Sequence, residues 1–172
     1  HWDKLSFDKY GNLCIQKFIS KIPSEDLEIH AHELAHRLTQ LATHRFANHV
    51  LQSYVDQAVH YSNAETVAII VNAMKKGFFE LATDQFGSFV VCTALAAFED
   101  EASTPLVDFC VQGSNICKIA RTQYGCQLLQ RWVDVASESQ LKRISIALSS
   151  CFAAVSRDKF GNHFCLKMMS SR

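Results

Sequence analysis

The sequence contains little proline and glycine, with two prolines and six glycines among 172 residues. Folds built from many short strands need more of both residues, because glycine and proline set the backbone angles of tight turns. Stretches such as "ETVAIIVNAMKK" (65–76) and "SQLKRISIALSS" (139–150) instead carry apolar residues at three- and four-residue spacing. The serines of "SNAE" (62–65) and "SESQ" (137–140) each precede a Glu or Gln by three residues, as in a capping box. We therefore predict an all-α chain with helices that start at these two serines.

The sequence also lacks a run of 18 apolar residues, a C-x-x-C pair and a net charge. We expect no membrane-spanning segment. Seven scattered cysteines fit reduced, mostly buried thiols inside a cell better than a disulfide framework or a closed zinc site, so we expect Cys110, Cys117 and Cys151 to pack in the core. Seventeen Lys and Arg balance seventeen Asp and Glu, so bulk charge alone cannot hold a polyanion.

The strongest feature of the sequence is an internal repeat. Five segments align without gaps, and they are "LSFDKYGNLCIQ" (5–16), "LATHRFANHVLQ" (41–52), "LATDQFGSFVVC" (81–92), "IARTQYGCQLLQ" (119–130) and "VSRDKFGNHFCL" (155–166). Each segment contains an aromatic residue followed by Gly or Ala, and an Asp often precedes them. The aromatic residues recur at intervals of 36, 40, 38 and 36, and they are Tyr10, Phe46, Phe86, Tyr124 and Phe160.

A period of this length has room for about three short helices, which cannot bury their apolar faces without neighbours. We therefore predict an α-solenoid of about five three-helix repeats. The expected limits of the repeats are 1–37, 38–77, 78–115, 116–151 and 152–172, the last of them incomplete. The small residue after each aromatic predicts a tight helix start, with the aromatic side chain packed between units.

Residues 32–36 read "HELAH" and match the H-E-x-x-H motif of zinc peptidases, in which two histidines hold Zn²⁺ and the glutamate activates a water. An apolar stripe at helical spacing runs along the same segment, through Leu27, Ala31, Leu34, Ala35, Leu38, Leu41 and Ala42. His32, Glu33 and His36 lie roughly 130° or more from the centre of that stripe. We therefore predict that the match to the motif is a coincidence and that its side chains face solvent. We also predict that the chain is not an enzyme and has no resident metal or cofactor.

The repeated segment carries two polar positions that lie one turn apart on the same helix face. These pairs are Asn12 with Gln16, Asn48 with Gln52, Ser88 with Cys92, Cys126 with Gln130, and Asn162 with Leu166. The position directly after the first member of each pair holds Leu13, His49, Phe89, Gln127 and His163. Amide side chains can meet the Watson–Crick edge of a base, and flat rings can stack on it. A merely solvated helix face would not explain why amides and rings recur in these columns.

The motifs "YGN...Q", "FAN...Q", "YGC...Q" and "FGN" at this spacing resemble the Pumilio-type RNA-binding repeats of the PUF family. The resemblance implies a crescent of three-helix repeats whose second helices bind single-stranded RNA, one base per repeat. In that family the first and fifth positions of the five-residue motif contact the base edge, and the second position stacks on the base. Because the family usually has eight repeats, we expect this chain to be part of a longer array.

Carried over by position, the resemblance implies a partial recognition code. Asn12 with Gln16 and Asn48 with Gln52 resemble uracil-binding pairs, and Cys126 with Gln130 resembles an adenine-binding pair. The pairs Ser88 with Cys92 and Asn162 with Leu166 depart from the family pattern, and Leu13 and Gln127 replace the usual stacking ring or arginine. Since the family binds RNA antiparallel, the expected RNA core is 5′-N-A-N-U-U-3′.

Three hypotheses of function follow. The first is a monomeric, cytoplasmic protein that binds mRNA 3′ untranslated regions and recruits repressor or decay proteins. The second is a divergent factor of ribosome biogenesis in the nucleus or nucleolus, which binds structured or nonspecific nucleic acid. The third is a helical scaffold that binds only protein. Lys9, Arg45 and Lys159 share one repeated column and are either phosphate contacts or ordinary surface charges.

Overall fold

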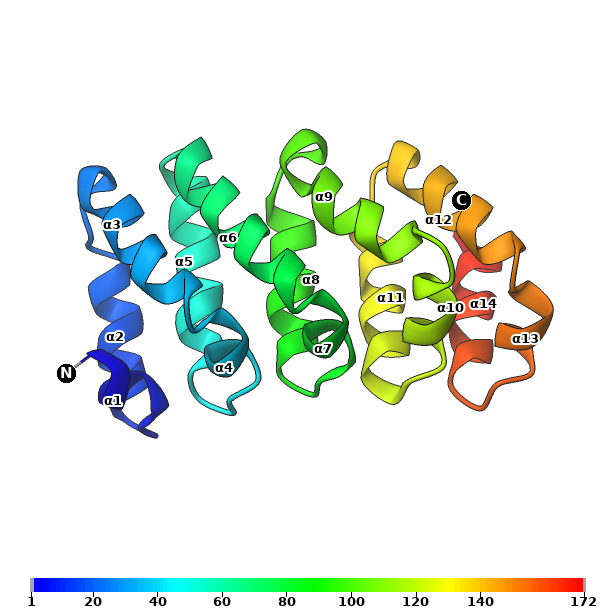
Figure 1. The fold of residues 1–172 in the computed structure, drawn as a ribbon, viewed down its shortest axis with the longest axis horizontal. Helices are drawn as coiled ribbons and strands as arrows, with labels where there is room; N and C mark the ends of the chain where they lie inside the picture. Colours follow the sequence, from blue (N-terminus) through cyan, green and yellow to red (C-terminus); the bar gives the residue numbers. More distant parts are fainter. Residues whose placement is uncertain (1, 172) are drawn as a thin grey trace.

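The computed structural model describes residues 2–171, which form fourteen helices and no strand (Figure 1). The helices are α1 (Trp2–Phe7), α2 (Gly11–Ile19), α3 (Ser24–Ala35), α4 (Leu38–Ala42), α5 (Asn48–His60), α6 (Ala64–Lys76), α7 (Phe78–Thr83), α8 (Gly87–Ala97), α9 (Asp100–Val111), α10 (Asn115–Ala120), α11 (Gln123–Val135), α12 (Glu138–Ser149), α13 (Phe152–Ser156) and α14 (Gly161–Ser170). Four groups of three helices are followed by the pair α13 and α14. The predicted all-α solenoid is confirmed, whereas the repeat limits stay a division made from the sequence.

Equivalent helices stand next to each other along the array. The second helices α2, α5, α8, α11 and α14 form one row in chain order, and α3, α6, α9 and α12 form another (Figure 1). The buried apolar side chains make a single cluster that extends from Ile15 in α2 to Cys165 in α14. Successive units therefore complete one continuous core, which is why so short a repeat can be stable.

The second helix of each repeat starts very close to the short helix that precedes it. A Cβ atom on Gly11, Gly87, Gly125 or Gly161 would come within 3.0 Å of a backbone oxygen in the preceding helix. The second repeat accommodates Ala47 at this position with its side chain fully buried. The predicted tight helix start is therefore confirmed, and close backbone approach is its physical cause.

The aromatic side chains before Gly or Ala differ in how far they are buried. Tyr10 is 69% exposed, and of the five rings in this column Phe160 packs against the core. The expectation that the rings pack between units is therefore wrong for Tyr10, whereas the other four rings are half-buried. The aromatic residue lies at the helix start, on a surface turn, and Lys9, Arg45 and Lys159 place their charges over the rings that follow them.

One of the two predicted helix caps differs in the structure. Ser137 caps α12, because its hydroxyl accepts a hydrogen bond from the backbone N–H of Gln140 at 3.2 Å. In the "SNAE" segment the cap is Asn63, whose side-chain oxygen accepts from the N–H of Thr66 at 2.9 Å. Ser62 has a φ of 50° and belongs to the preceding turn, so a start at Ser62 is wrong.

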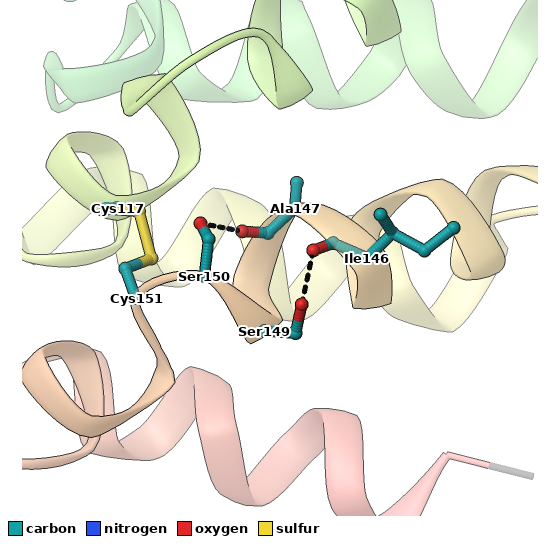
Figure 2. Close-up of a disulfide and its surroundings, with 6 residues drawn as sticks. All are labelled: Cys117, Ile146, Ala147, Ser149, Ser150 and Cys151. Atoms are coloured by element: carbon teal, nitrogen blue, oxygen red, sulfur yellow. Dashed lines mark hydrogen bonds between the residues drawn. A yellow bond between two sulfur atoms is a disulfide. The ribbon is translucent and has the colours of Figure 1, made fainter.

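The structure also corrects the expectation for the cysteines. Cys117 of α10 and Cys151, which immediately precedes α13, form a disulfide that joins α10 to the start of the α13–α14 pair (Figure 2). The two residues are 34 apart in sequence, and the stacking of successive repeats brings their Cα atoms to 6.2 Å. Sequence spacing could not reveal this pair. Of the other five cysteines, Cys110, Cys126 and Cys165 are buried thiols, as predicted for most of them, and burial raises the pKa of Cys110 to about 12.

Across residues 2–171, no helix is both long enough and apolar enough to span a bilayer.

Candidate nucleic-acid interface

The row of second helices carries the predicted stacking positions on its open surface. All five side chains in this column are exposed, and they belong to Leu13, His49, Phe89, Gln127 and His163. Exposure is 60% for Leu13 and 43% for Phe89, although both are apolar side chains that the core could have taken up. Each of these helices therefore offers one side chain to a partner that lies along the row.

The residue that precedes each stacking position is fixed inside the turn. Asn12 and Asn48 are only 4% and 2% exposed, and their amide groups donate to the carbonyl groups of Asp8 and His44 at 2.8 and 2.9 Å. A short polar side chain at this position satisfies a backbone carbonyl at the helix start and cannot move freely. The first member of each amide pair is therefore a rigid support.

The second member of each amide pair is held by the first. The Nε2 group of Gln16 donates to Oδ1 of Asn12 at 2.8 Å, and Gln52 donates to Asn48 at the same distance. Both glutamines are half-buried, so part of each amide faces solvent. Each pair thus presents a donor and an acceptor in a fixed orientation, as recognition of a base edge requires.

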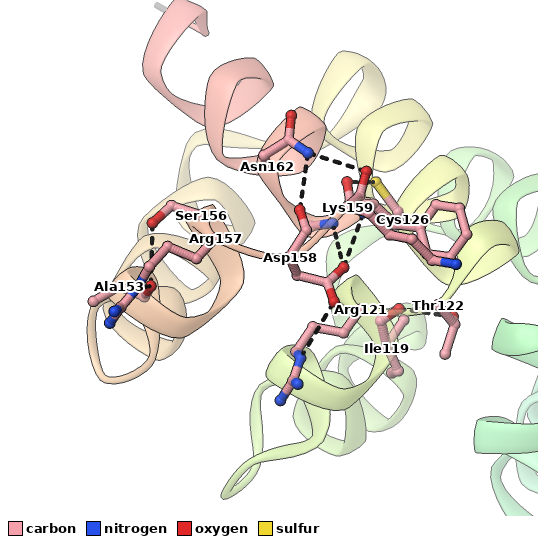
Figure 3. A network of polar contacts seen from close by, with 12 residues as sticks. Ile119, Arg121, Thr122, Cys126, Ala153, Ser156, Arg157, Asp158, Lys159 and Asn162 are labelled. Atoms are coloured by element: carbon pink, nitrogen blue, oxygen red, sulfur yellow. Dashed lines mark hydrogen bonds and ion pairs between the residues drawn. The ribbon is translucent and has the colours of Figure 1, made fainter.

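The fourth repeat uses a thiol where the first two use an asparagine (Figure 3). The Cys126 thiol donates to the carbonyl oxygen of Phe160 at 2.9 Å and accepts from Nε2 of Gln130 at 3.2 Å. Gln130 is held by its partner as in the first two repeats, but the smaller Cys126 leaves more room in front of the pair.

The third and fifth repeats lack a complete pair. Ser88 is 1% exposed, and its hydroxyl donates to the carbonyl oxygen of Gln85 at 3.4 Å, while burial raises the pKa of the half-buried Cys92 thiol. In the fifth repeat Asn162 donates to the carbonyl oxygens of Asp158 and Lys159, as Asn12 does to Asp8 and Lys9 (Figure 3). Leu166 is 61% exposed and offers no hydrogen bond.

The orientation of these helices depends on the repeated aspartate, for which the sequence alone suggested no role. Asp8, Asp84 and Asp158 each accept hydrogen bonds from two backbone N–H groups at the start of the following helix, at 2.7–3.0 Å. These bonds lower the pKa of Asp8 and Asp158, with the N–H of Gly11 and of Gly161 as the largest cause. His44 and Thr122 take the same place in the other two repeats. The repeated Asp in the sequence was the signal for this cap.

The candidate phosphate contacts lie at the N-terminal ends of three second helices. Lys9, Arg45 and Lys159 are exposed, and their charged groups lie 5.2, 4.7 and 4.7 Å from the ring centres of the aromatic residues that follow them. The rings hold these charges beside the starts of α2, α5 and α14.

The "HELAH" segment lies away from the row of second helices. The side chains of His32 and Glu33 are 63% and 75% exposed, and His36 is exposed just beyond the end of α3. The predicted solvent-facing orientation is confirmed, although the apolar stripe belongs to two helices, because the chain turns between Ala35 and Leu38. In the part of the chain that the structure describes, no group of three or more His, Cys, Asp or Glu could hold a metal ion.

Comparison with known proteins identifies this repeat. The model of the Pumilio-family RNA binding repeat matches residues 1–29, 37–53, 77–91, 115–146 and 151–170, which together make up well over half of the chain. The chain belongs to the Pumilio family. Each matched segment includes the start of a second helix, with the capping residue and the first of the two polar positions of the repeat.

Relatives and solved structures extend this finding. The chain is 22% identical over 165 residues to suppressor protein MPT5 of Saccharomyces cerevisiae, and this alignment covers 92% of the chain and 19% of MPT5. It is 23% identical over 167 residues to Pumilio homolog 11 of Arabidopsis thaliana, and that alignment covers 93% of the chain and 28% of the homolog. The Puf4 RNA binding domain, solved with an HO endonuclease RNA 3′ UTR recognition sequence, superposes with a TM-score of 0.89 at 20% identity, covering 97% of this chain and 50% of Puf4. Yeast Puf5p, solved with SMX2 RNA, gives 0.84 at 20% identity, covering 98% and 47%. The chain thus spans about half the length of these solved domains.

Proposed function

We propose that this chain binds single-stranded RNA along α2, α5, α8, α11 and α14, with one base at each helix. The observation that carries the proposal is the repeated geometry of an exposed stacking side chain between two members of a fixed polar pair. Base stacking on such side chains contributes roughly 1–3 kcal/mol per base. Since the net charge is zero, we expect stacking and edge contacts to supply most of the affinity and the salt dependence to be shallow.

The amide pairs fit uracil at the first two repeats. The Watson–Crick edge of uracil presents an N3–H donor between two carbonyl acceptors, and a fixed glutamine amide offers both a matching acceptor and a matching donor. At the fourth repeat Gln130 offers the same amide group, and the smaller Cys126 leaves space for the larger adenine ring. With antiparallel binding these pairs select 5′-N-A-N-U-U-3′.

The biological role that we propose is post-transcriptional regulation. A protein that selects a short sequence in single-stranded RNA can mark particular messages, and the solved Puf4 domain holds a recognition sequence from a 3′ untranslated region. By analogy, this protein would bind 3′ untranslated regions of mRNA in the cytoplasm as a monomer and recruit repressor or decay proteins.

Fluorescence anisotropy with labelled RNA tests this proposal. The RNA carries 5′-UACUU-3′ within constant flanking nucleotides, and a second RNA has the fourth base changed to cytosine. We expect the change to weaken binding by about tenfold, because cytosine presents an acceptor where uracil has its N3–H donor. Gln52→Ala should remove this difference at the fourth base and leave recognition of the fifth base intact.

A matched pair of histidine variants tests the stacking column. His49→Ala removes an exposed ring from the row and should weaken binding to both RNAs by about fivefold or more. His60→Ala changes an exposed histidine at the other end of α5 and should leave affinity unchanged. Equal binding of both RNAs by the wild type, with a steep salt dependence, would contradict sequence selection. That result would favour the alternative of a structured or nonspecific nucleic-acid ligand, to which the incomplete pairs of the third and fifth repeats also point.

A further inference from the structure

The third repeat offers a stacking side chain without a base-edge pair on its own helix. Phe89 is 43% exposed, but Ser88 is buried and Cys92 offers only a thiol with a raised pKa. Recognition of a base edge requires fixed hydrogen-bonding groups, and these two residues leave few of them. A group from elsewhere must therefore act at this repeat if its base is to be selected.

Arg131, from α11 of the next repeat, lies at this place. Its guanidinium carbon lies over the Phe89 ring, 4.2 Å from the ring centre, and α8 packs against α11. The guanidinium charge also opposes the effect of burial on the pKa of the Cys92 thiol, so the charge acts at the third repeat. Arg131 therefore belongs by sequence to the fourth repeat and by position to the third.

The equivalent residue of the fifth repeat behaves differently. Lys167 occupies the position of Arg131 in the repeat and forms an ion pair with Asp134 of the preceding repeat. The residue that corresponds to Asp134 one repeat earlier is Ala96, which has no charge. Among the side chains that the structure describes, no carboxylate lies within ion-pair distance of Arg131. Arg131 thus has no carboxylate at this position that would draw its side chain away from Phe89.

One nitrogen of the guanidinium has no hydrogen-bond partner. The Nη1 atom of Arg131 is buried and unpaired, and in the described part of the chain the only other buried side-chain nitrogen or oxygen in this condition is Oγ1 of Thr66. Buried donors in folded proteins are nearly always paired, so an unpaired one at a binding surface calls for a ligand acceptor. A base that stacks off-centre on Phe89 would lie beside the guanidinium, in the same layer, and would present its edge to these N–H groups.

We propose that Arg131 determines the base bound at the third repeat, and that this base is cytosine. A guanidinium offers parallel N–H donors and matches a base edge with two adjacent acceptors. Cytosine presents N3 and O2 in this way on its Watson–Crick edge, whereas uracil has a donor between its two acceptors and adenine places an amino group beside N1. Guanine has two adjacent acceptors only on its other edge, at O6 and N7. This inference rests on the proposed function and extends it to the third base.

The test uses four RNAs of the form 5′-UAXUU-3′, with X as each of the four bases, and the whole chain. The wild type should bind X = C at least about fivefold more tightly than X = A or X = U. Arg131→Lys keeps the charge and loses the fork of donors, so it should bring the four affinities together at the third base. Lys17→Ala changes the equivalent exposed residue of the first repeat and should leave the preference at X intact.

The fourth base separates the failure of this inference from the failure of the proposed function. If the wild type prefers uracil over cytosine at the fourth base but binds all four X bases equally, Arg131 has no selective role and the inference is overturned. The same conclusion holds if Arg131→Lys keeps the wild-type preference at X. A preference for X = G that Arg131→Lys removes would retain Arg131 as the selective residue and overturn the assignment to cytosine. Loss of all discrimination, at the fourth base as well, would reject the proposed function itself. Circular dichroism of each variant confirms that the helices are intact.

Discussion

The interface between the first two repeats and the interface between the last two are built from the same helix rows but are joined by different polar contacts. In the first, the hydroxyl of Tyr54 donates to the carbonyl oxygen of Leu27 at 2.9 Å inside the core, and the carboxyl groups of Glu28 and Glu65 meet at the surface. In the last, a disulfide joins Cys117 to Cys151 (Figure 2), and an ion pair joins Arg121 to Asp158 (Figure 3). A second ion pair joins Lys167 to Asp134.

The difference follows from how much apolar surface each unit buries. The second repeat contributes many buried side chains from three helices, whereas α13 and α14 contribute only Val155, Phe164 and Cys165 to the buried apolar cluster. Burial of apolar area is the main stabilising term in such stacks. In this chain we therefore expect the last interface to depend more on its cross-links and the first more on its packing.

The largest expected effect comes from removing the disulfide. Cys117→Ser opens a link that closes a loop between residues 34 apart in the unfolded chain, and the loss should cost about 2–4 kcal/mol of the free energy of unfolding. Urea unfolding, followed by circular dichroism, measures this change. A reducing agent should move the wild type to the midpoint of the variant and should not affect the variant.

Cys14→Ser is the matched control for this experiment, because Cys14 is exposed and free. It should leave the unfolding midpoint and its response to the reductant unchanged. A wild-type midpoint that does not respond to the reductant would show that the last interface does not depend on the bridge, and the contrast between the two interfaces would be lost.

A smaller effect is expected at the first interface. Tyr54→Phe keeps the packing of a ring that is 1% exposed and removes one buried hydrogen bond to Leu27, which should cost about 1 kcal/mol. Tyr61→Phe, at the exposed end of the same helix, should have no measurable effect on urea unfolding. An effect of Tyr54→Phe as large as that of the disulfide would mean that the first interface also relies on a single polar link.

The smallest effects are on the pH dependence of stability, where the two interfaces should respond in opposite directions. The pKa of Asp158 is lowered, chiefly by the N–H of Gly161 and also by Arg121, so its contribution to stability is present above its unfolded pKa and lost as the pH falls through the folded value. The pKa of Glu65 is raised by its contact with Glu28, so the penalty is present at neutral pH and relieved as the pH falls through the raised value.

Two conservative variants measure these opposite responses in urea unfolding from about pH 7 to about pH 3. Asp158→Asn can still cap the helix and should lower the midpoint at neutral pH, with the difference from the wild type shrinking in acid. Glu65→Gln should raise the midpoint at neutral pH, and this gain should also disappear in acid. Parallel pH profiles for both variants and the wild type would contradict the assignment of these charges to the two interfaces.

Much of the architecture could be predicted from the sequence, because the same local pattern occurs five times along the chain. The helical period, the tight start at Gly11 and its equivalents, and the exposure of Leu13 and its column all depend on contacts within one repeat or between identical repeats. The same local logic placed the "HELAH" side chains in solvent, because an apolar stripe on one face of a helix leaves the opposite face exposed. It failed for Tyr10 of the aromatic column, because the burial of these rings depends on contacts outside the repeated segment.

The sequence by itself therefore determined the fold class, the family and the columns of the binding surface, since these are properties of a local pattern that repeats. Only the tertiary structure decided which residues meet across repeats. Cys117 joins Cys151, and Arg131 lies over Phe89 of the preceding repeat, because stacking brings together residues about one period apart that no local pattern pairs. Each of these contacts occurs at one interface only, so a pattern shared by the five repeats does not reveal it.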